Sequence, residues 1–252
     1  MSLLSVASAP VAGGVAPAMH APDRFLTVPI ALLFWVISAA VIGLAVRRTN
    51  RELDEKMVPL MGVMAAFIFA AQMFNFQVVG GTSGHLLGGV LAAVLLGPWA
   101  ATLVMASVIA VQALVFSDGG LVVMGANIFN MGIIGTLGGY AIYRFVAGVL
   151  GGEERARIPA AGIAGWISVV LGSISLALML AASGTSPLEV VLPSMVTVHA
   201  FIGVGEALIT AAALAFIAAT RPDLLDLRPD RAAAAATRAA QGAAGSAAPS
   251  AA

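Results

Sequence analysis

The sequence is poor in charge. Of its 252 residues only 10% are Asp, Glu, Lys or Arg, and 60% are hydrophobic. Soluble domains carry roughly 25% charged residues, so this chain cannot cover a water-facing surface of its size. That shortage excludes a soluble enzyme and a nucleic-acid-binding protein. The chain also has no cysteine, which excludes a disulfide-stapled secreted domain, thiolate metal sites and thiol nucleophiles.

Three sequence patterns are missing as well. There is no P-loop, so the chain cannot hydrolyse ATP itself, and there is no HExxH zincin motif. No internal repeat is evident, which gives no support to an inverted-repeat secondary transporter.

Long apolar runs predict an all-α, polytopic membrane bundle, because a bilayer core requires about 20 apolar residues per helix. The clear spans are residues 25–46, 58–76, 121–147, 159–182 and 190–219. The stretch from His85 to Phe116 is too long for one span, and Gly97-Pro98 lies in its middle. Proline removes a backbone donor and clashes with the preceding turn. The stretch is therefore either one kinked helix or two shorter helices joined by a tight turn.

The basic residues decide between these alternatives, because cytoplasmic loops are enriched in Lys and Arg. Two helices over 85–116 place eleven of the twelve basic residues in the cytoplasm and leave only Arg24 outside. One helix would move seven of the eleven outside. We therefore expect seven transmembrane helices over residues 19–225, with the N-terminus outside and the C-terminus in the cytoplasm. Residues 226–252, Ala-rich and of low complexity, are expected to be a disordered cytoplasmic tail.

Polar residues inside the spans are candidates for function or for packing. His199 lies seven residues before Glu206, so both occupy one face of the last helix. They are either a structural pair that braces the bundle or functional groups. Amides within membrane helices more often bond across helices than bind ligands. This interpretation applies to Gln72, Gln112, Asn127 and Asn130.

The N-terminal segment has coordination chemistry. Ala16-Pro17-Ala18 is a small-x-small cleavage pattern. Cleavage there, or translation from Met19, would leave a chain end at Met19-His20. Its α-amine, the deprotonated amide nitrogen of His20 and the His20 imidazole could then chelate one metal, with His85 as the external candidate for the fourth corner. Tetragonal nitrogen sites suit Ni(II) and Cu(II), and Co(II) is a further candidate.

This chelate depends on the state of residues 1–18. If the extension stays attached, the amine becomes an amide and the chelate cannot form. A histidine near an N-terminus is otherwise usually just solvated.

Four segments together resemble the CbiM/NikM family. They are MHAPDRFL (19–26); GGTSGHLLGG (80–89) with LLGPW (95–99); DGG (118–120) with GANIFNM (125–131); and HAFIGVGEALIT (199–210). The family comprises the substrate-binding membrane components of energy-coupling-factor (ECF) transporters for cobalt or nickel. The resemblance covers about residues 19–225 and implies seven helices with an N-terminal Met-His loop inserted into the bundle.

The resemblance also implies roles for individual residues. The metal ligands would be Met19 through its amine, His20 through its amide and imidazole, and His85 through its imidazole. Four residues would support the site: Asn127 and Asn130 by bracing the inserted loop, with His199 and Glu206 in a supporting role. The small-residue face at Ala66 and Ala70 resembles the surface that such components press against their coupling partner.

The implied function is that of a non-catalytic subunit of an ATP-driven importer in the cytoplasmic membrane, with Co(II) or Ni(II) as its substrate and no permanent cofactor. The expected partners are a CbiQ/NikQ-like coupling protein, CbiO/NikO-like ATPases and a small CbiN/NikN-like subunit. Two alternatives remain. One is an intramembrane enzyme that uses His199 and Glu206, and the other is a stand-alone metal carrier or channel.

Overall fold

The computed structural model describes residues 20–53, 55, 57–73, 76–78 and 82–225. Met19, the predicted extension 1–18 and the predicted tail 226–252 lie outside the described residues.

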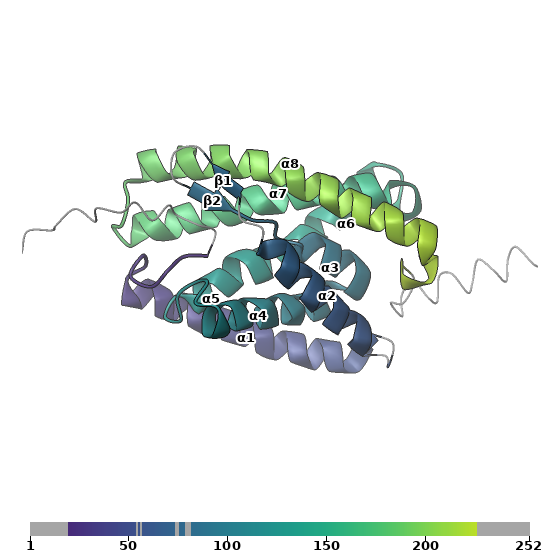
Figure 1. The fold of residues 1–252 in the computed structure, drawn as a ribbon, viewed down its shortest axis with the longest axis horizontal. Helices are drawn as coiled ribbons and strands as arrows, with labels where there is room; N and C mark the ends of the chain where they lie inside the picture. Colours follow the sequence, from purple (N-terminus) through teal and green to yellow (C-terminus); the bar gives the residue numbers. More distant parts are fainter. Residues whose placement is uncertain (1–19, 54, 56, 74–75, 79–81, 226–252) are drawn as a thin grey trace, which may run out of the picture.

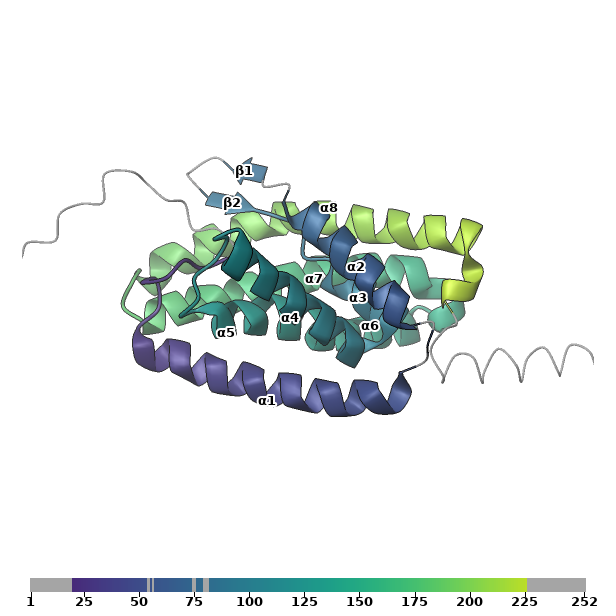
Figure 2. The same ribbon diagram turned by 60° about the horizontal axis from the view of Figure 1, so that its bottom comes forward.

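The described chain is an elongated bundle of helices that run along one common direction (Figures 1 and 2). The helices are α1 (Val28–Glu52), α2 (Met57–Gln72), α3 (Gly89–Leu96), α4 (Pro98–Val115), α5 (Met124–Asn127), α6 (Gly139–Val149), α7 (Glu153–Ala182) and α8 (Leu188–Thr220). A π-helical segment, Ile128–Gly138, joins α5 to α6, so these three pieces form one rod. A 3₁₀ turn, Pro222–Leu225, follows α8. The predicted all-α bundle is confirmed.

The predicted loop 76–84 contains a small β-hairpin. Strand β1 (Phe76–Val78) pairs antiparallel with β2 (Thr82–Gly84), and Phe76 lies opposite Gly84. The preceding helix ends at Gln72 rather than at residue 76.

Five rods are long and apolar enough to cross a membrane: α1, α4, α5–α6, α7 and α8. Helix α2 is apolar but has only 16 residues. Helix α3 has eight residues, or about 12 Å of length at 1.5 Å per residue, against a hydrocarbon core of about 30 Å. The structure therefore shows a multi-helix membrane bundle, while seven complete crossings remain a prediction.

The stretch 85–116 is broken at Gly97, as the two-helix interpretation predicts. Gly97 has φ 86° and ψ 156°, a conformation that essentially only glycine adopts. Pro98 then begins α4, where a missing N–H costs nothing. All eight residues of α3 are buried, so this short helix lies inside the bundle.

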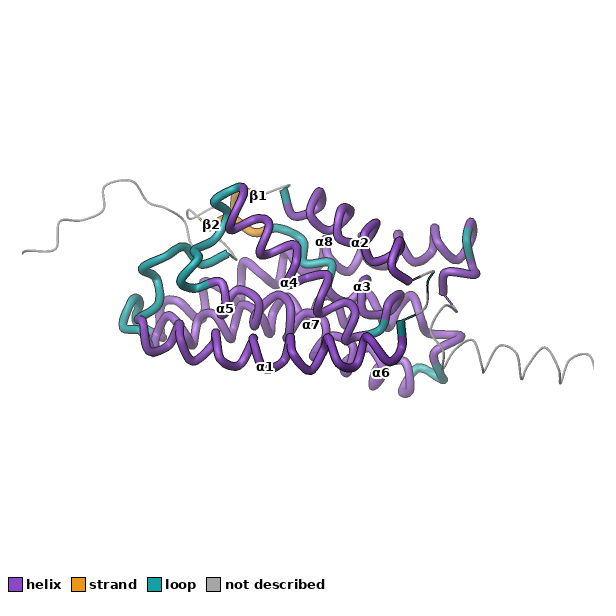
Figure 3. The backbone as a smooth tube through the Cα atoms, turned by 90° about the horizontal axis from the view of Figure 1, so that it is seen from below, coloured by secondary structure: helices purple, strands orange, loops and turns teal. Residues whose placement is uncertain are grey.

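The loops gather at two ends of the bundle. At one end the start of α1 bonds to the α7–α8 turn, because Thr27 N–H donates to Ser183 Oγ at 3.1 Å. The α4–α5 loop lies at the same end, where Gly120 N–H donates to Ala21 O at 3.0 Å. The α1–α2 and α6–α7 connections and the end of α8 lie at the other end (Figure 1). Most of the loop backbone belongs to the first end (Figure 3).

Glycines allow two elements to touch at the backbone. A Cβ on Gly89, the first residue of α3, would lie 2.8 Å from the backbone of Gly135 in the π-helical segment. Close approach of this kind requires small residues. This contact fixes the start of α3 against the rod formed by α5, the π-helical segment and α6.

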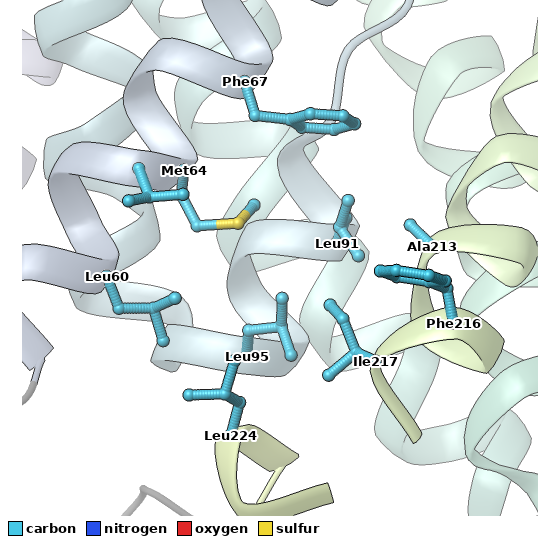
Figure 4. Close-up of a pocket in the computed structure, with 10 residues that line it drawn as sticks. Leu60, Met64, Phe67, Leu91, Leu95, Ala213, Phe216, Ile217 and Leu224 are labelled. Atoms are coloured by element: carbon cyan, nitrogen blue, oxygen red, sulfur yellow. The ribbon is translucent and has the colours of Figure 1, made fainter. Parts of the chain in front are cut away.

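An apolar cavity of about 420 Å³ lies between α2, α3 and α8. Its walls are Leu, Met, Phe, Val, Ile and Ala side chains, among them Leu60, Phe67, Leu95 and Phe216 (Figure 4). Its lining side chains offer no nitrogen or oxygen donor. Buried nitrogen donors lie instead at the end of the bundle where the N-terminal segment docks.

Candidate metal-binding site

The segment after His20 is tied into the bundle. Ala21 N–H donates to Asn127 Oδ1 at 3.0 Å, and Asn127 Nδ2 donates back to Ala21 O at 3.1 Å. Asn127 therefore holds the backbone of Ala21 through both of its amide atoms. These bonds fix the backbone immediately after His20.

Asp23 provides a second tie. Its carboxylate accepts from the backbone N–H groups of Leu121, Val122 and Val123 at 3.2, 2.8 and 3.4 Å. A Cβ on Gly120 would lie 2.1 Å from Asp23 Oδ1, so only glycine fits there. Sequence reasoning missed Asp23, although its place in the MHAPD run was a signal.

Two histidines 65 positions apart meet at this end. His20 and His85 are 2% and 1% exposed. The distance between His20 Nδ1 and His85 Nε2 is 3.0 Å, and the rings are stacked with centroids 4.5 Å apart. We expected His85 to begin the third helix, but α3 begins at Gly89 because Gly88 has φ 72° and leaves the helical region.

The hydrogen bonds define the proton positions of the pair. A carbonyl oxygen only accepts, so the 2.9 Å contact between His85 Nδ1 and Leu86 O requires a proton on Nδ1. In the neutral ring Nε2 then carries a lone pair directed at His20, whose Nδ1 donates to it. Burial, and after it the neighbouring His85, lower the pKa of His20 well below its usual value, which favours the neutral form of that ring.

The loop that carries His85 is held from two sides. Glu206 accepts from the N–H groups of Leu87 and Gly88, both at 2.8 Å. Gln72 Nε2 donates to Leu87 O at 2.9 Å, and Gln112 Nε2 donates to Gln72 Oε1 at 2.9 Å. These two amides bond across helices, as predicted for amides in the spans, and the effect is to fix the backbone beside His85.

Among the described residues, the other predicted site residues make no hydrogen bond to His20 or His85. These are His199, Asn130 and the small face of α2. His199 Nδ1 donates to Met195 O in its own helix at 2.7 Å. Asn130 Nδ2 donates to Met179 Sδ at 3.5 Å on α7. Ala66 and Ala70 are exposed on α2.

Asp118 is a further residue that sequence reasoning did not assign to the site. Its Oδ1 lies 3.5 Å from His20 Nδ1. The DGG segment that contains it was noted only as a motif. Among the described residues no three His, Asp or Glu side chains lie close enough together to hold a metal ion. A metal site here would therefore need further donors in addition to such side chains.

The sequence and the fold of the chain both match those of known proteins. The family model CbiM, described as "Cobalt uptake substrate-specific transmembrane region", matches residues 20–224. A protein of Archaeoglobus fulgidus named "Putative fused nickel transport protein NikMN" is 44% identical over 210 residues, covering 82% of this chain and 68% of its own length. The cobalt transport protein CbiM of Sorangium cellulosum is 35% identical over 204 residues, covering 77% of this chain and 88% of its own.

A solved structure, "Crystal Structure of an Truncated Transition metal Transporter", superposes with a TM-score of 0.73 at 30% identity. The match covers 79% of this chain and 97% of that one. Because the family model spans most of the chain and these relatives share its fold, the chain belongs to the CbiM family and is a multi-pass membrane protein of the CbiM/NikM metal-transport type.

Proposed function

We propose that this chain is the substrate-binding membrane subunit of an ATP-driven importer for Co(II) or Ni(II). The observation that carries the proposal is the buried pair of imidazoles, His20 and His85, with facing nitrogens 3.0 Å apart. A buried polar pair of this kind is costly unless it has a ligand or a structural purpose.

The spacing of the pair suits a shared metal. Two nitrogens about 2.0 Å from one ion and at right angles to each other lie about 2.8 Å apart. The measured 3.0 Å between His20 Nδ1 and His85 Nε2 requires only a small adjustment. These are also the two atoms that the chelate uses, since the six-membered ring of a Met-His end closes through Nδ1.

The other two donors would be the Met19 amine and the His20 amide nitrogen. Both follow only if Met19 is the mature chain end. Intact-mass measurement or end-group sequencing of the purified protein tests this point. We expect a chain that starts at Met19, and a chain that still starts at Met1 would contradict the four-nitrogen site.

Energy would come from partner subunits, because the chain has no P-loop. We propose a CbiQ/NikQ-like coupling protein that contacts the exposed Ala66 and Ala70 face of α2, CbiO/NikO-like ATPases, and a small CbiN/NikN-like subunit. The end of the bundle that carries Arg47, Arg48 and Arg155 would face the cytoplasm, and the His20–His85 end would face outward. The membrane would be the cytoplasmic membrane.

Short α3 fits a seven-span topology. It would cross together with the non-helical segment 85–88, whose backbone is satisfied by Glu206 and Gln72. Irregular backbone at membrane depth is tolerated where it is buried in protein. Asn127 and Glu206 would thus position the two halves of the site, and His199 and Asn130 would support the surrounding helices.

Metal binding to purified variants tests the proposal. His20→Ala and His85→Ala should each weaken equilibrium binding of Ni(II) and Co(II) by more than about a hundredfold, the upper end of the loss caused by removing an outer partner of a ligand. His199→Ala, which removes the third buried histidine of the chain, is the comparison and should lower the affinity less, by at most the roughly 10- to 100-fold typical of residues outside the ligand set. Unchanged affinity in His20→Ala would overturn the ligand assignment.

A further inference from the structure

Asp118 is held in place by a strained loop. Ser117 has φ 54°, which is uncommon for a residue with a side chain, and Gly119 has φ 97°. Asp118 N–H donates to Gln112 O at 3.0 Å. A Cβ on Gly119 would lie 3.1 Å from Asn127 Nδ2 and 3.4 Å from His20 Cβ. Strain of this kind persists only where the surroundings impose it, and it is common at functional sites.

The loop places the Asp118 carboxylate between the histidine pair and solvent. Asp118 Oδ1 is 3.5 Å from His20 Nδ1, and its side chain is 29% exposed, against 1% for His20. The carboxylate therefore lies beside His20 Nδ1, one of the two nitrogens that would share a metal.

The charge of a loaded site calls for such a group. A divalent ion bound by two neutral imidazoles, a neutral amine and one amide anion leaves a net charge of +1. A net charge in a buried site is costly unless an opposite charge lies near it. The other carboxylates beside the site, Asp23 and Glu206, are engaged by backbone N–H groups.

We propose that Asp118 is the counter-charge of the metal-loaded site and makes the site selective for divalent cations, without being a metal ligand. This inference rests on the proposed function. The carboxylate lies 3.5 Å from His20 Nδ1, one of the two nitrogens that would hold the metal, so it is close enough to offset the charge of the ion. Asp118 is thus a positioning and charge-compensating residue.

The test is nickel binding to Asp118→Asn, which keeps the shape of the side chain and removes its charge. We expect the Kd for Ni(II) to rise about 10- to 100-fold, the range typical for partners outside the ligand set. The visible absorption bands of the bound nickel should stay unchanged because the four donors are the same. The Tm of the metal-free protein should also stay the same. Asp118→Glu should recover most of the affinity.

Glu189→Gln is the matched control, because Glu189 is an exposed carboxylate in the first turn of α8. It should leave the Kd unchanged, which shows that general surface charge is not responsible. A Kd for Ni(II) of Asp118→Asn within twofold of that of the unchanged protein would overturn the proposed role of Asp118 as a counter-charge. Shifted absorption bands would also overturn the proposal, because a change in the donors of the nickel would identify Asp118 as a metal ligand. Failure of the proposed function itself appears separately, as unchanged binding in His20→Ala.

Discussion

Glu206 on α8 holds the backbone next to His85, one of the proposed metal ligands. Its two oxygens accept from Leu87 and Gly88, the second and third residues after His85. Two charge-assisted bonds to consecutive N–H groups hold the loop more firmly than neutral bonds would. The carboxylate is 2% exposed, so water cannot replace it.

Glu206→Gln should therefore weaken Ni(II) binding by about 10- to 100-fold. The amide keeps one acceptor but turns an N–H₂ donor toward a backbone N–H, which leaves one buried donor unsatisfied. Equilibrium binding to the purified protein measures the effect. Glu189→Gln on the same helix should have none, and equal affinities for the two variants would contradict the positioning role.

Single residues differ in how well the sequence predicted them. The three histidines could be identified because ionisable groups are rare in this chain. Asn127 was identified as a brace, and its bonds to Ala21 are present. Asp23 and Asp118 could not be assigned, because their roles depend on loop conformations that bring residues about a hundred positions apart into contact.

Among the elements, α3 and the π-helical segment form the support beneath His85. Gly89 follows His85 by four residues and touches the backbone of Gly135. π-Helical turns are rare and frequently occur at functional sites. Here the segment carries Asn130 and Gly135 and continues directly from Asn127, so one rod contacts the chain shortly after each of the two histidines.

Gly89→Ala should lower stability and metal affinity together. Its new Cβ would lie 2.8 Å from the Gly135 backbone, and such overpacking costs about 1–3 kcal/mol. Gly62→Ala on α2 is the control, because a Cβ there meets nothing within 4 Å. Replacing a mid-helix glycine by alanine gains roughly 0.5–1 kcal/mol. Thermal unfolding in detergent compares the two, and a Tm for Gly89→Ala equal to that of Gly62→Ala would refute the close contact.

The sequence predicted the rods well and their details poorly. Apolar runs located each long helix to within a few residues, and Gly97-Pro98 located the break before α4. Neither the shortness of α3 nor the hairpin was predicted. The non-helical backbone before α3 depends on tertiary bonds from Gln72 and Glu206 to Leu87 and Gly88. The π-helical segment leaves no periodic signal that separates it from an α-helix.

On the scale of the whole molecule, the two ends differ in charge. Among the described residues Arg24 lies at the end that carries His20, whereas the basic residues at the ends of α1, α6 and α8 lie at the other (Figure 1). Arg48, for example, stacks over Trp99 near the start of α4. A single helix over 85–116 could not have produced this separation, so charge and geometry support the same topology.

Labelling of single cysteines tests the orientation without background, because the chain has no native cysteine. Glu189→Cys and Arg155→Cys place exposed thiols at opposite ends of the bundle. A membrane-impermeant maleimide should label position 189 in intact cells and position 155 only after permeabilisation. The reverse pattern would place the histidine pair in the cytoplasm and contradict an importer that captures metal outside.

X-ray absorption of the nickel-loaded protein tests the central claim most directly, because it reports the atoms bound to the metal. The account predicts four nitrogen donors at about 2.0 Å from the nickel, two of them imidazoles. Any nickel that His85→Ala still binds should have one imidazole donor fewer. A sulfur donor, a shell of oxygen atoms, or a spectrum unchanged by His85→Ala would contradict it.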